Sequence, residues 1–98
     1  MYKWHIFKNQ RFEWNEIKRQ SNIRKHGIDF ADAVGVFFDE QAITIQDNDH
    51  NEERFVSIGL DHLSQLLIVI YTYRNPNTIR LISARKANKF ECRTYERL

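Results

Sequence analysis

The sequence predicts an α+β fold in which helices pack against an antiparallel sheet of about four strands. The first observation is the run Leu66–Ile70, five apolar residues of which three are β-branched, as in a strand covered on both faces. The second is that further strand-like segments follow one another with only short turns between them, which favours antiparallel pairing. The third is the position of the helix signals outside these segments: caps and one run of helical apolar spacing before them, and a helix-compatible stretch after them, which predict N-terminal helices and a C-terminal helix.

The N-terminal part predicts short strands and then a helix. Trp4-x-Ile6 and Phe12-x-Trp14 alternate as strands do. Asn15 is a good N-cap, and Gly27 is a typical stop signal, so a helix is expected over 15–26.

A second helix is expected after Asp29, which can cap it. Apolar residues recur with i, i+3, i+4, i+7, i+8 spacing over about three turns, which predicts an amphipathic helix packed on the core. These residues are Phe30, Ala33, Val34, Phe37 and Phe38.

The remaining elements form the sheet and its last helix. Strands are expected over 42–46 and 54–60, and then as a central hairpin. The hairpin consists of Leu66–Arg74 and Thr78–Ala84, joined at Asn75-Pro76-Asn77 because proline cannot continue a strand. A helix over 87–98 follows, docked by Phe90, with Tyr95 and Leu98 as further candidates.

Length and composition predict one domain over residues 1–98. Cys92 is the only cysteine, which excludes an internal disulfide and fits a reducing cytoplasm. No apolar run approaches the roughly 18 residues of a membrane helix, and no signal peptide is recognisable, so we expect a cytoplasmic protein without a membrane partner.

The net charge is only +2, but an acidic segment over 39–54 separates two basic segments. Such a layout can steer a phosphate backbone or an acidic protein partner, and it equally fits a solvated surface of mixed sign.

Motifs for phosphate loops, zinc proteases and paired cysteines are absent from the sequence. Asp47-x-Asp49 resembles the start of a calcium loop, but Glu52 and Ile58 occupy the positions that need Gly and Glu. A weak metal site from Asp47, Asp49 and His50 is disfavoured, so we expect neither a metal nor a cofactor.

The remaining polar residues suit RNA cleavage without a metal. A base removes the 2′-hydroxyl proton, cations hold charge on phosphorus, and an acid protonates the leaving oxygen; arginine binds phosphate oxygens in pairs. The candidates for phosphate and transition-state charge are Arg54, Arg80, Arg85 and Lys86. The candidates for proton transfer are Tyr71, His26, Glu53 and also His50, with Thr72 nearby.

A polar stripe on the first helix, with Ser83 of the last strand, is a candidate RNA-binding surface. The stripe consists of Asn15, Lys18, Asn22 and Lys25, spaced 3, 4 and 3 residues apart. It is equally compatible with a solvated outer face.

A regular strand puts Arg80 and Arg85 on opposite faces. The two converge only if the strand ends or twists near Ser83.

Several segments in combination resemble the BrnT toxins of bacterial type II toxin–antitoxin systems. They are Asn22…Lys25-His26-Gly27, Glu53-Arg54-Phe55…Ile58-Gly59 and Ile79-Arg80…Ile82-Ser83-Ala84-Arg85-Lys86-Ala87. The resemblance covers nearly the whole chain after about Phe12 and leaves MYKWHIFKNQR outside the shared pattern.

The resemblance implies a RelE-like α+β fold and a metal-independent ribonuclease that arrests translation. It also implies a cognate BrnA-like antitoxin through which the complex binds its promoter DNA. Tyr71 stands where members often carry His, and tyrosine is the poorer base at neutral pH.

Two other functions remain open from the sequence. One is a non-catalytic partner that only binds the antitoxin and regulates transcription. The other is nucleic-acid binding without cleavage, which needs a continuous basic groove; the acidic segment over 39–54 argues mildly against one.

Overall fold

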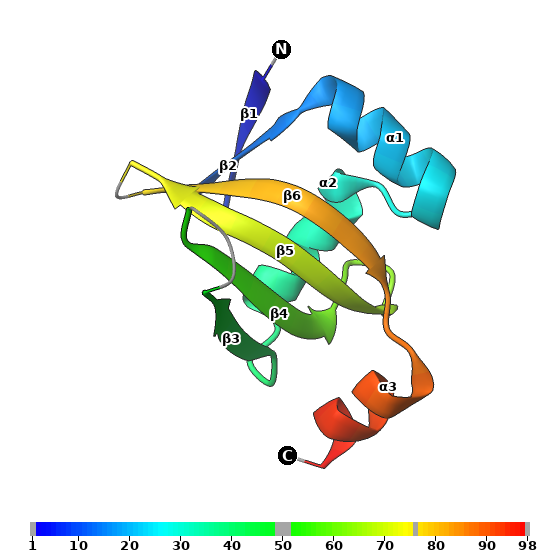
Figure 1. Ribbon diagram of the computed structural model, residues 1–98. Helices are drawn as coiled ribbons and strands as arrows, with labels where there is room; N and C mark the ends of the chain where they lie inside the picture. Colours follow the sequence, from blue (N-terminus) through cyan, green and yellow to red (C-terminus); the bar gives the residue numbers. More distant parts are fainter. Residues whose placement is uncertain (1, 49–51, 76, 98) are drawn as a thin grey trace.

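A six-stranded mixed sheet organises the computed structural model, which describes residues 2–48, 52–75 and 77–97 (Figure 1). The strand order is β1-β2-β6-β5-β4-β3. The strands are β1 (Tyr2–Phe7), β2 (Gln10–Asn15), β3 (Ile43–Asp47), β4 (Arg54–Leu60), β5 (Leu66–Arg74) and β6 (Thr78–Lys86). The helices are α1 (Glu16–His26), α2 (Phe30–Ala33), the 3₁₀ helix η1 (Val34–Phe38) and α3 (Lys89–Glu96).

The prediction of an α+β fold is confirmed, but a purely antiparallel sheet of four strands is wrong. β1 and β2 form an N-terminal hairpin, and β2 pairs in parallel with β6 through Arg11–Thr78, Phe12–Ile79 and Glu13–Arg80. The hairpin turns at Lys8 and Asn9, both at positive φ (51° and 68°). This turn carries no glycine, so the usual sequence signal of a two-residue hairpin is missing.

The central hairpin and the 54–60 strand are confirmed with the predicted bounds, and β6 runs two residues further, to Lys86. β5 lies inside the sheet between β4 and β6, which explains why Leu67, Ile68 and Val69 are all buried. Pro76 of the predicted turn lies outside the described residues.

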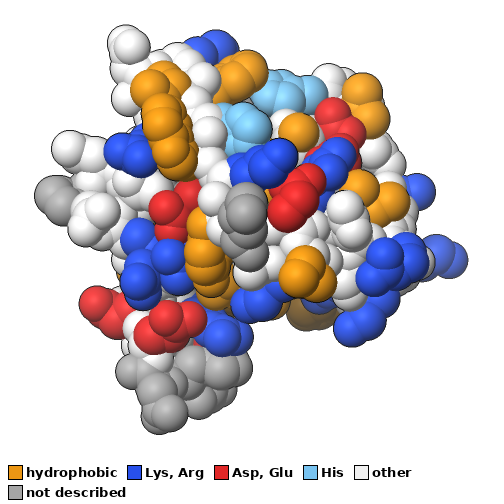
Figure 2. Space-filling model, turned by 90° about the horizontal axis from the view of Figure 1, so that it is seen from above, with side chains coloured by type: hydrophobic (Ala, Val, Ile, Leu, Met, Phe, Trp, Pro, Cys, Tyr) orange, Lys and Arg blue, Asp and Glu red, His pale blue; other side chains and the backbone are white. Residues whose placement is uncertain are grey.

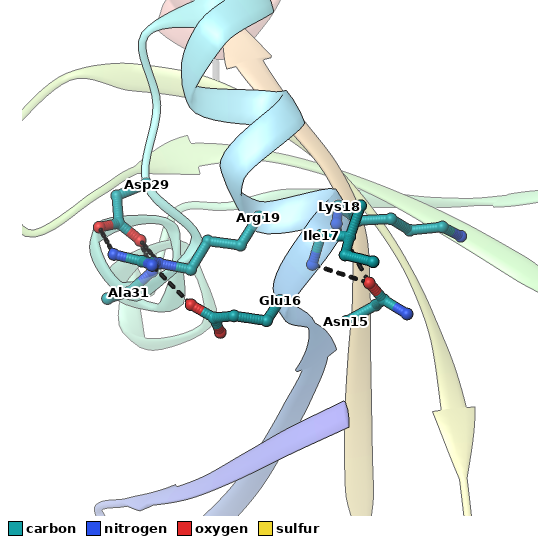
Figure 3. A network of polar contacts seen from close by, with 7 residues as sticks. All are labelled: Asn15, Glu16, Ile17, Lys18, Arg19, Asp29 and Ala31. Atoms are coloured by element: carbon teal, nitrogen blue, oxygen red, sulfur yellow. Dashed lines mark hydrogen bonds and ion pairs between the residues drawn. The ribbon is translucent and has the colours of Figure 1, made fainter. Parts of the chain in front are cut away.

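The first helix is confirmed with both predicted caps. The Asn15 side chain accepts hydrogen bonds from the backbone N–H groups of Ile17 and Lys18, and Gly27 ends the helix in the left-handed region at φ 71°. Arg19 ties this helix to the next segment, since its guanidinium donates to both carboxylate oxygens of Asp29 (2.9 and 2.8 Å) and to Glu16 (2.6 Å) (Figure 3).

The second helix is shorter than predicted. One α-helical turn, α2, passes into the 3₁₀ helix η1. A Cβ built on Gly35 would lie 2.5 Å from the backbone nitrogen of His62, so this segment packs directly on the backbone of the turn before β5.

α2 and η1 cover one face of the sheet, here called the inner face (Figure 1). The core between them and the sheet includes the predicted Phe30, Ala33 and Val34, and Phe37 and Phe38 pack against it. The opposite face of the sheet is called the outer face below.

The C-terminal helix is shorter than predicted and is held by polar contacts. Phe90 was expected to dock it but is 71% exposed, which makes that prediction wrong. Asn88 and Glu91 form a capping box, and the Tyr95 hydroxyl donates to Asp39 (2.6 Å), raising the pKa of Tyr95 to about 12. Leu98 lies outside the described residues. Among residues 2–48, 52–75 and 77–97, no helix has the length and apolar character needed to cross a membrane.

Candidate functional site in a groove between α1 and β6

An irregularity in the central hairpin decides which side chains of β6 share a face. Tyr71 pairs with Leu81, whereas the next residue back on β5, Ile70, pairs with Ser83, so Ile82 is an extra residue in β6. On β5, the partners of Arg80, Ser83 and Arg85 are Thr72, Ile70 and Ile68, respectively. These three partners are spaced two positions apart and therefore lie on the same face of β5. The bulge therefore puts Arg80, Ser83 and Arg85 on the outer face together.

The bulge lies beside α1, where β2 has already ended. A hollow of about 230 Å³ opens between the helix and the strand. Its lining residues are Lys18, Ser21, Asn22, Lys25, His26, Ile82 and Ser83. The structure thus brings together five of the predicted site residues, four from the first helix and one from the last strand.

Asn22 joins the two walls of this hollow. Its amide nitrogen donates to the carbonyl oxygens of Ala84 (2.8 Å) and Ile28 (2.9 Å), and its Oδ1 accepts from the Ala84 N–H (3.1 Å). The side chain is only 5% exposed. Asn22 therefore replaces the backbone of a neighbouring strand, and its polar atoms hold α1 against β6.

The other lining residues give the hollow a preference for anions. Lys18 and Lys25 are exposed and bring two ammonium groups, and His26 adds an exposed imidazole. Ser21 and Ser83 add hydroxyl groups, and the described lining includes no carboxylate or thiol. This donor set suits a phosphate group.

The predicted arginines share the outer face, but each has an acidic neighbour. Arg80 Nε donates to Glu13 Oε2 (2.6 Å), and the Arg54 side chain lies 3.5 Å from Glu52. The Arg85 guanidinium binds both carboxylate oxygens of Glu91 (2.9 and 2.8 Å).

The Arg85–Glu91 pair connects β6 to α3. Hydrogen bonds from Arg85 hold the pKa of Glu91 below its ordinary range, despite opposition from partial burial. In Figure 2, Lys and Arg side chains form separate groups with Asp and Glu among them rather than one continuous patch.

Arg80 and Arg85 do not converge at one point. They are five positions apart along β6, which places their Cα atoms roughly 15 Å apart at the usual rise per residue. Lys86 pairs with Leu67 at the end of β6 and is exposed, away from the hollow's lining.

The predicted proton carriers other than His26 lie elsewhere. Tyr71 belongs to the core, 3% exposed, with its hydroxyl 2.9 Å from Ser57 Oγ, so it is not at the surface where sequence reasoning placed it. Glu53 is exposed and accepts from Gln46 (2.8 Å), and Thr72 donates to the Glu53 carbonyl. His50 and Asp49, and with them the disfavoured metal site, lie outside the described residues.

Sequence reasoning missed Ser21 and Ile82 in the hollow. Ser21 lies three residues after Lys18 and four before Lys25, so the helical stripe already contained the signal. Ile82 is the extra residue of the bulge, for which the sequence carries no clear sign.

Comparison with known proteins identifies relatives that share this architecture. The family model described as the ribonuclease toxin BrnT of type II toxin–antitoxin systems matches residues 14–91, which include α1, the bulge and the hollow. The crystal structure of the Brucella abortus ribonuclease toxin BrnT is similar, with 31% identity and a TM-score of 0.63. The similarity covers 78% of this chain and 94% of that one. No curated protein matches the chain.

Proposed function

The chain belongs to the BrnT family of ribonuclease toxins of type II toxin–antitoxin systems, and from that premise we propose that it cleaves RNA in the groove between α1 and β6. The observation that carries the proposal is the gathering of Lys18, Lys25, His26 and Ser83 around one hollow. The set combines positive charge with an imidazole, the side chain that most often serves as a general acid or base.

In the proposed reaction the ribose 2′-oxygen attacks the adjacent phosphorus after losing its proton. A new P–O2′ bond forms and the P–O5′ bond breaks, leaving a cyclic phosphate and a 5′-hydroxyl. Lys18 and Lys25 hold the phosphate oxygens, His26 transfers the proton at either the 2′- or the 5′-oxygen, and a solvent water transfers the proton at the other. Asn22 fixes the helix against β6 so that these groups stay in register.

The predicted arginines have a secondary role in this proposal. Arg80 lies on the same face as Ser83, so it extends the positive field along β6 toward the substrate. The other charged candidates are proposed to contribute charge from a distance or to stabilise the fold, without contacting the reacting phosphate. They are Arg54, Arg85, Lys86 and Glu53. Tyr71 is left out because its hydroxyl is buried against Ser57.

The wider setting follows the family resemblance. We propose that residues 1–98 form one toxin domain with RelE-like ancestry, that cleavage is metal-independent and inhibits translation, and that the protein acts in the cytoplasm. A BrnA-like antitoxin would neutralise it and link it to promoter DNA.

Purified protein and a single-stranded RNA test the groove. His26→Ala should lower the cleavage rate about 10²–10⁴-fold because a positioned proton carrier is lost. Lys18→Ala with Lys25→Ala should weaken it further, whereas Arg24→Ala removes a cation from the same helix outside the groove and should leave the rate unchanged. Cleavage by the wild type should persist in excess EDTA.

Two results would overturn the groove as the active site. One is full activity in the folded His26→Ala and Lys18→Ala/Lys25→Ala variants. The other is equal loss in Arg24→Ala, which would indicate a general charge effect.

A non-catalytic function is the second candidate, because the acidic partners of Arg54, Arg80 and Arg85 suit structural roles for these residues. Expression without the antitoxin separates the two functions. Growth arrest with intact cellular RNA would favour a partner that only binds antitoxin and regulates transcription.

A further inference from the structure

Two aromatic side chains of β1 lie on the outer face, each covered by a guanidinium group. The Arg11 guanidinium carbon is 4.3 Å from the centre of the Trp4 ring, and that of Arg80 is 4.0 Å from the centre of the Tyr2 ring. Trp4 is nevertheless 56% exposed and Tyr2 45% exposed. Large aromatic surface therefore faces solvent beside two cations.

The strand register explains why these side chains gather. Trp4 pairs with Glu13, and Glu13 pairs with Arg80, so one row crosses β1, β2 and β6 on the outer face. Tyr2 lies two residues along the same strand, roughly 6.7 Å from Trp4 at the usual rise per residue. The carboxylate of Glu13 is occupied by Arg80, so the row keeps a net positive field together with Arg11.

This surface continues into the proposed groove. Tyr2 pairs with Asn15, the residue that caps α1, and Lys18 in the first turn of that helix lines the hollow. A chain whose phosphate lies in the hollow would have its neighbouring nucleotides over Tyr2 and Trp4.

We infer that Tyr2, Trp4, Arg11 and Arg80 form a stacking platform for unpaired bases of single-stranded RNA beside the groove. Bases stack on aromatic rings and on guanidinium planes, and every base has such a face, so the platform would bind with little sequence preference. The inference rests on the proposed function for its substrate class. Three of the four residues precede Trp14, where the family match begins, so most of the platform lies outside the matched residues.

Charge and shape favour RNA over a protein partner here. Both rings carry a cation directly on one face. Cation and ring side by side complement a nucleotide, which presents a phosphate and a planar base together.

Binding of a short single-stranded 2′-O-methyl oligonucleotide tests the platform without cleavage, because the attacking hydroxyl is blocked. Trp4→Ala should weaken binding about 5- to 150-fold, the range expected for losing one stacked base. The wild type should bind an abasic oligonucleotide of the same length at least as weakly as Trp4→Ala binds the normal one. RNA should also quench the wild-type tryptophan fluorescence, and this quenching should be lost in Trp4→Ala, since the other tryptophan, Trp14, is buried.

Ile6→Ala is the matched control because Ile6 lies on the same strand and face, 64% exposed, without an aromatic ring. It should bind the oligonucleotide as the wild type does. Unchanged RNA binding by Trp4→Ala would overturn the platform. If this variant bound RNA normally but were no longer rescued by the antitoxin, the surface would be assigned to a protein partner instead.

The proposed active site and the proposed platform can be contradicted independently of each other. If the groove variants cleave normally while Trp4→Ala still loses oligonucleotide binding, the proposed active site is wrong and the platform stands. If the groove variants lose cleavage while Trp4→Ala binds normally, the platform is wrong and the active site stands.

Discussion

The side chain of Asn22 completes the backbone hydrogen bonding of Ala84, accepting from its N–H and donating to its carbonyl. The two residues are 62 positions apart in the sequence. At this point β6 has passed the end of β2, and a helix side chain takes over the role of a neighbouring strand. The position of α1, and so of Lys18, Lys25 and His26, depends on this contact.

Asn22→Ala should destabilise the fold by about 1–3 kcal/mol, because it leaves buried backbone groups of Ala84 and Ile28 without partners. Denaturant unfolding measures the change. Ser21→Ala, its neighbour in the same hollow, should stay within about 0.5 kcal/mol of the wild type. Equal stability of the two variants would show that Asn22 does not anchor the helix.

Tyr71→Phe should cost stability but not activity. Tyr71 is 3% exposed, and its hydroxyl lies 2.9 Å from Ser57 Oγ, so removal of the hydroxyl should lower the free energy of unfolding by about 0.5–1.5 kcal/mol. RNA cleavage at a temperature well below unfolding should proceed at the wild-type rate. A large fall in that rate with unchanged stability would return Tyr71 to the catalytic set.

Gly35→Ala should destabilise strongly, by about 2–3 kcal/mol, because the new methyl group would lie 2.5 Å from the His62 backbone nitrogen. Gly27→Ala is the comparison, since its Cβ would meet nothing within 4 Å and only the positive φ opposes it. That strain costs about 1 kcal/mol. Thermal unfolding of both variants should rank Gly35→Ala below Gly27→Ala, and the reverse order would contradict the close backbone packing.

Asp29→Asn should lower the free energy of unfolding at pH 7 and make that free energy depend less on pH in the acidic range. Hydrogen bonds from Arg19 hold the pKa of Asp29 below its ordinary value, so its ionised form favours the folded state. That contribution is fully present above the unfolded pKa of about 4 and is lost as pH falls through the lower folded pKa. Unfolding curves at neutral pH and at successively lower pH should therefore converge for wild type and variant; a constant difference would argue against the ion pair.

Local signals in the sequence predicted most of the elements. Asn15 and Gly27 marked the ends of α1 correctly, and the apolar run at Leu66–Ile70 identified the central strand, because capping and burial act on near neighbours. The parallel pairing of β2 with β6 was missed because strand order depends on contacts 67 residues apart, such as Glu13 with Arg80.

The site was predicted in part for the same reason. The stripe on α1 follows from helical spacing, and Lys18, Asn22 and Lys25 of it line the hollow together with Ser83, whereas Asn15 caps the helix. The acidic partners of Arg80 and Arg85 come from β2 and α3, so no local pattern announces them. The bulge at Ile82 brought Arg80 and Ser83 to one face against the alternation of a regular strand.

The distance in sequence between α1 and the bulge also bears on the order of events during synthesis. The helix leaves the ribosome long before Ile82 and Ser83, which supply the opposite wall of the groove. Contacts of such long range form late in folding, since closing a large loop costs entropy before any contact repays it. A nascent chain that has not reached β6 therefore has no groove, and α1 alone presents only one of its two walls.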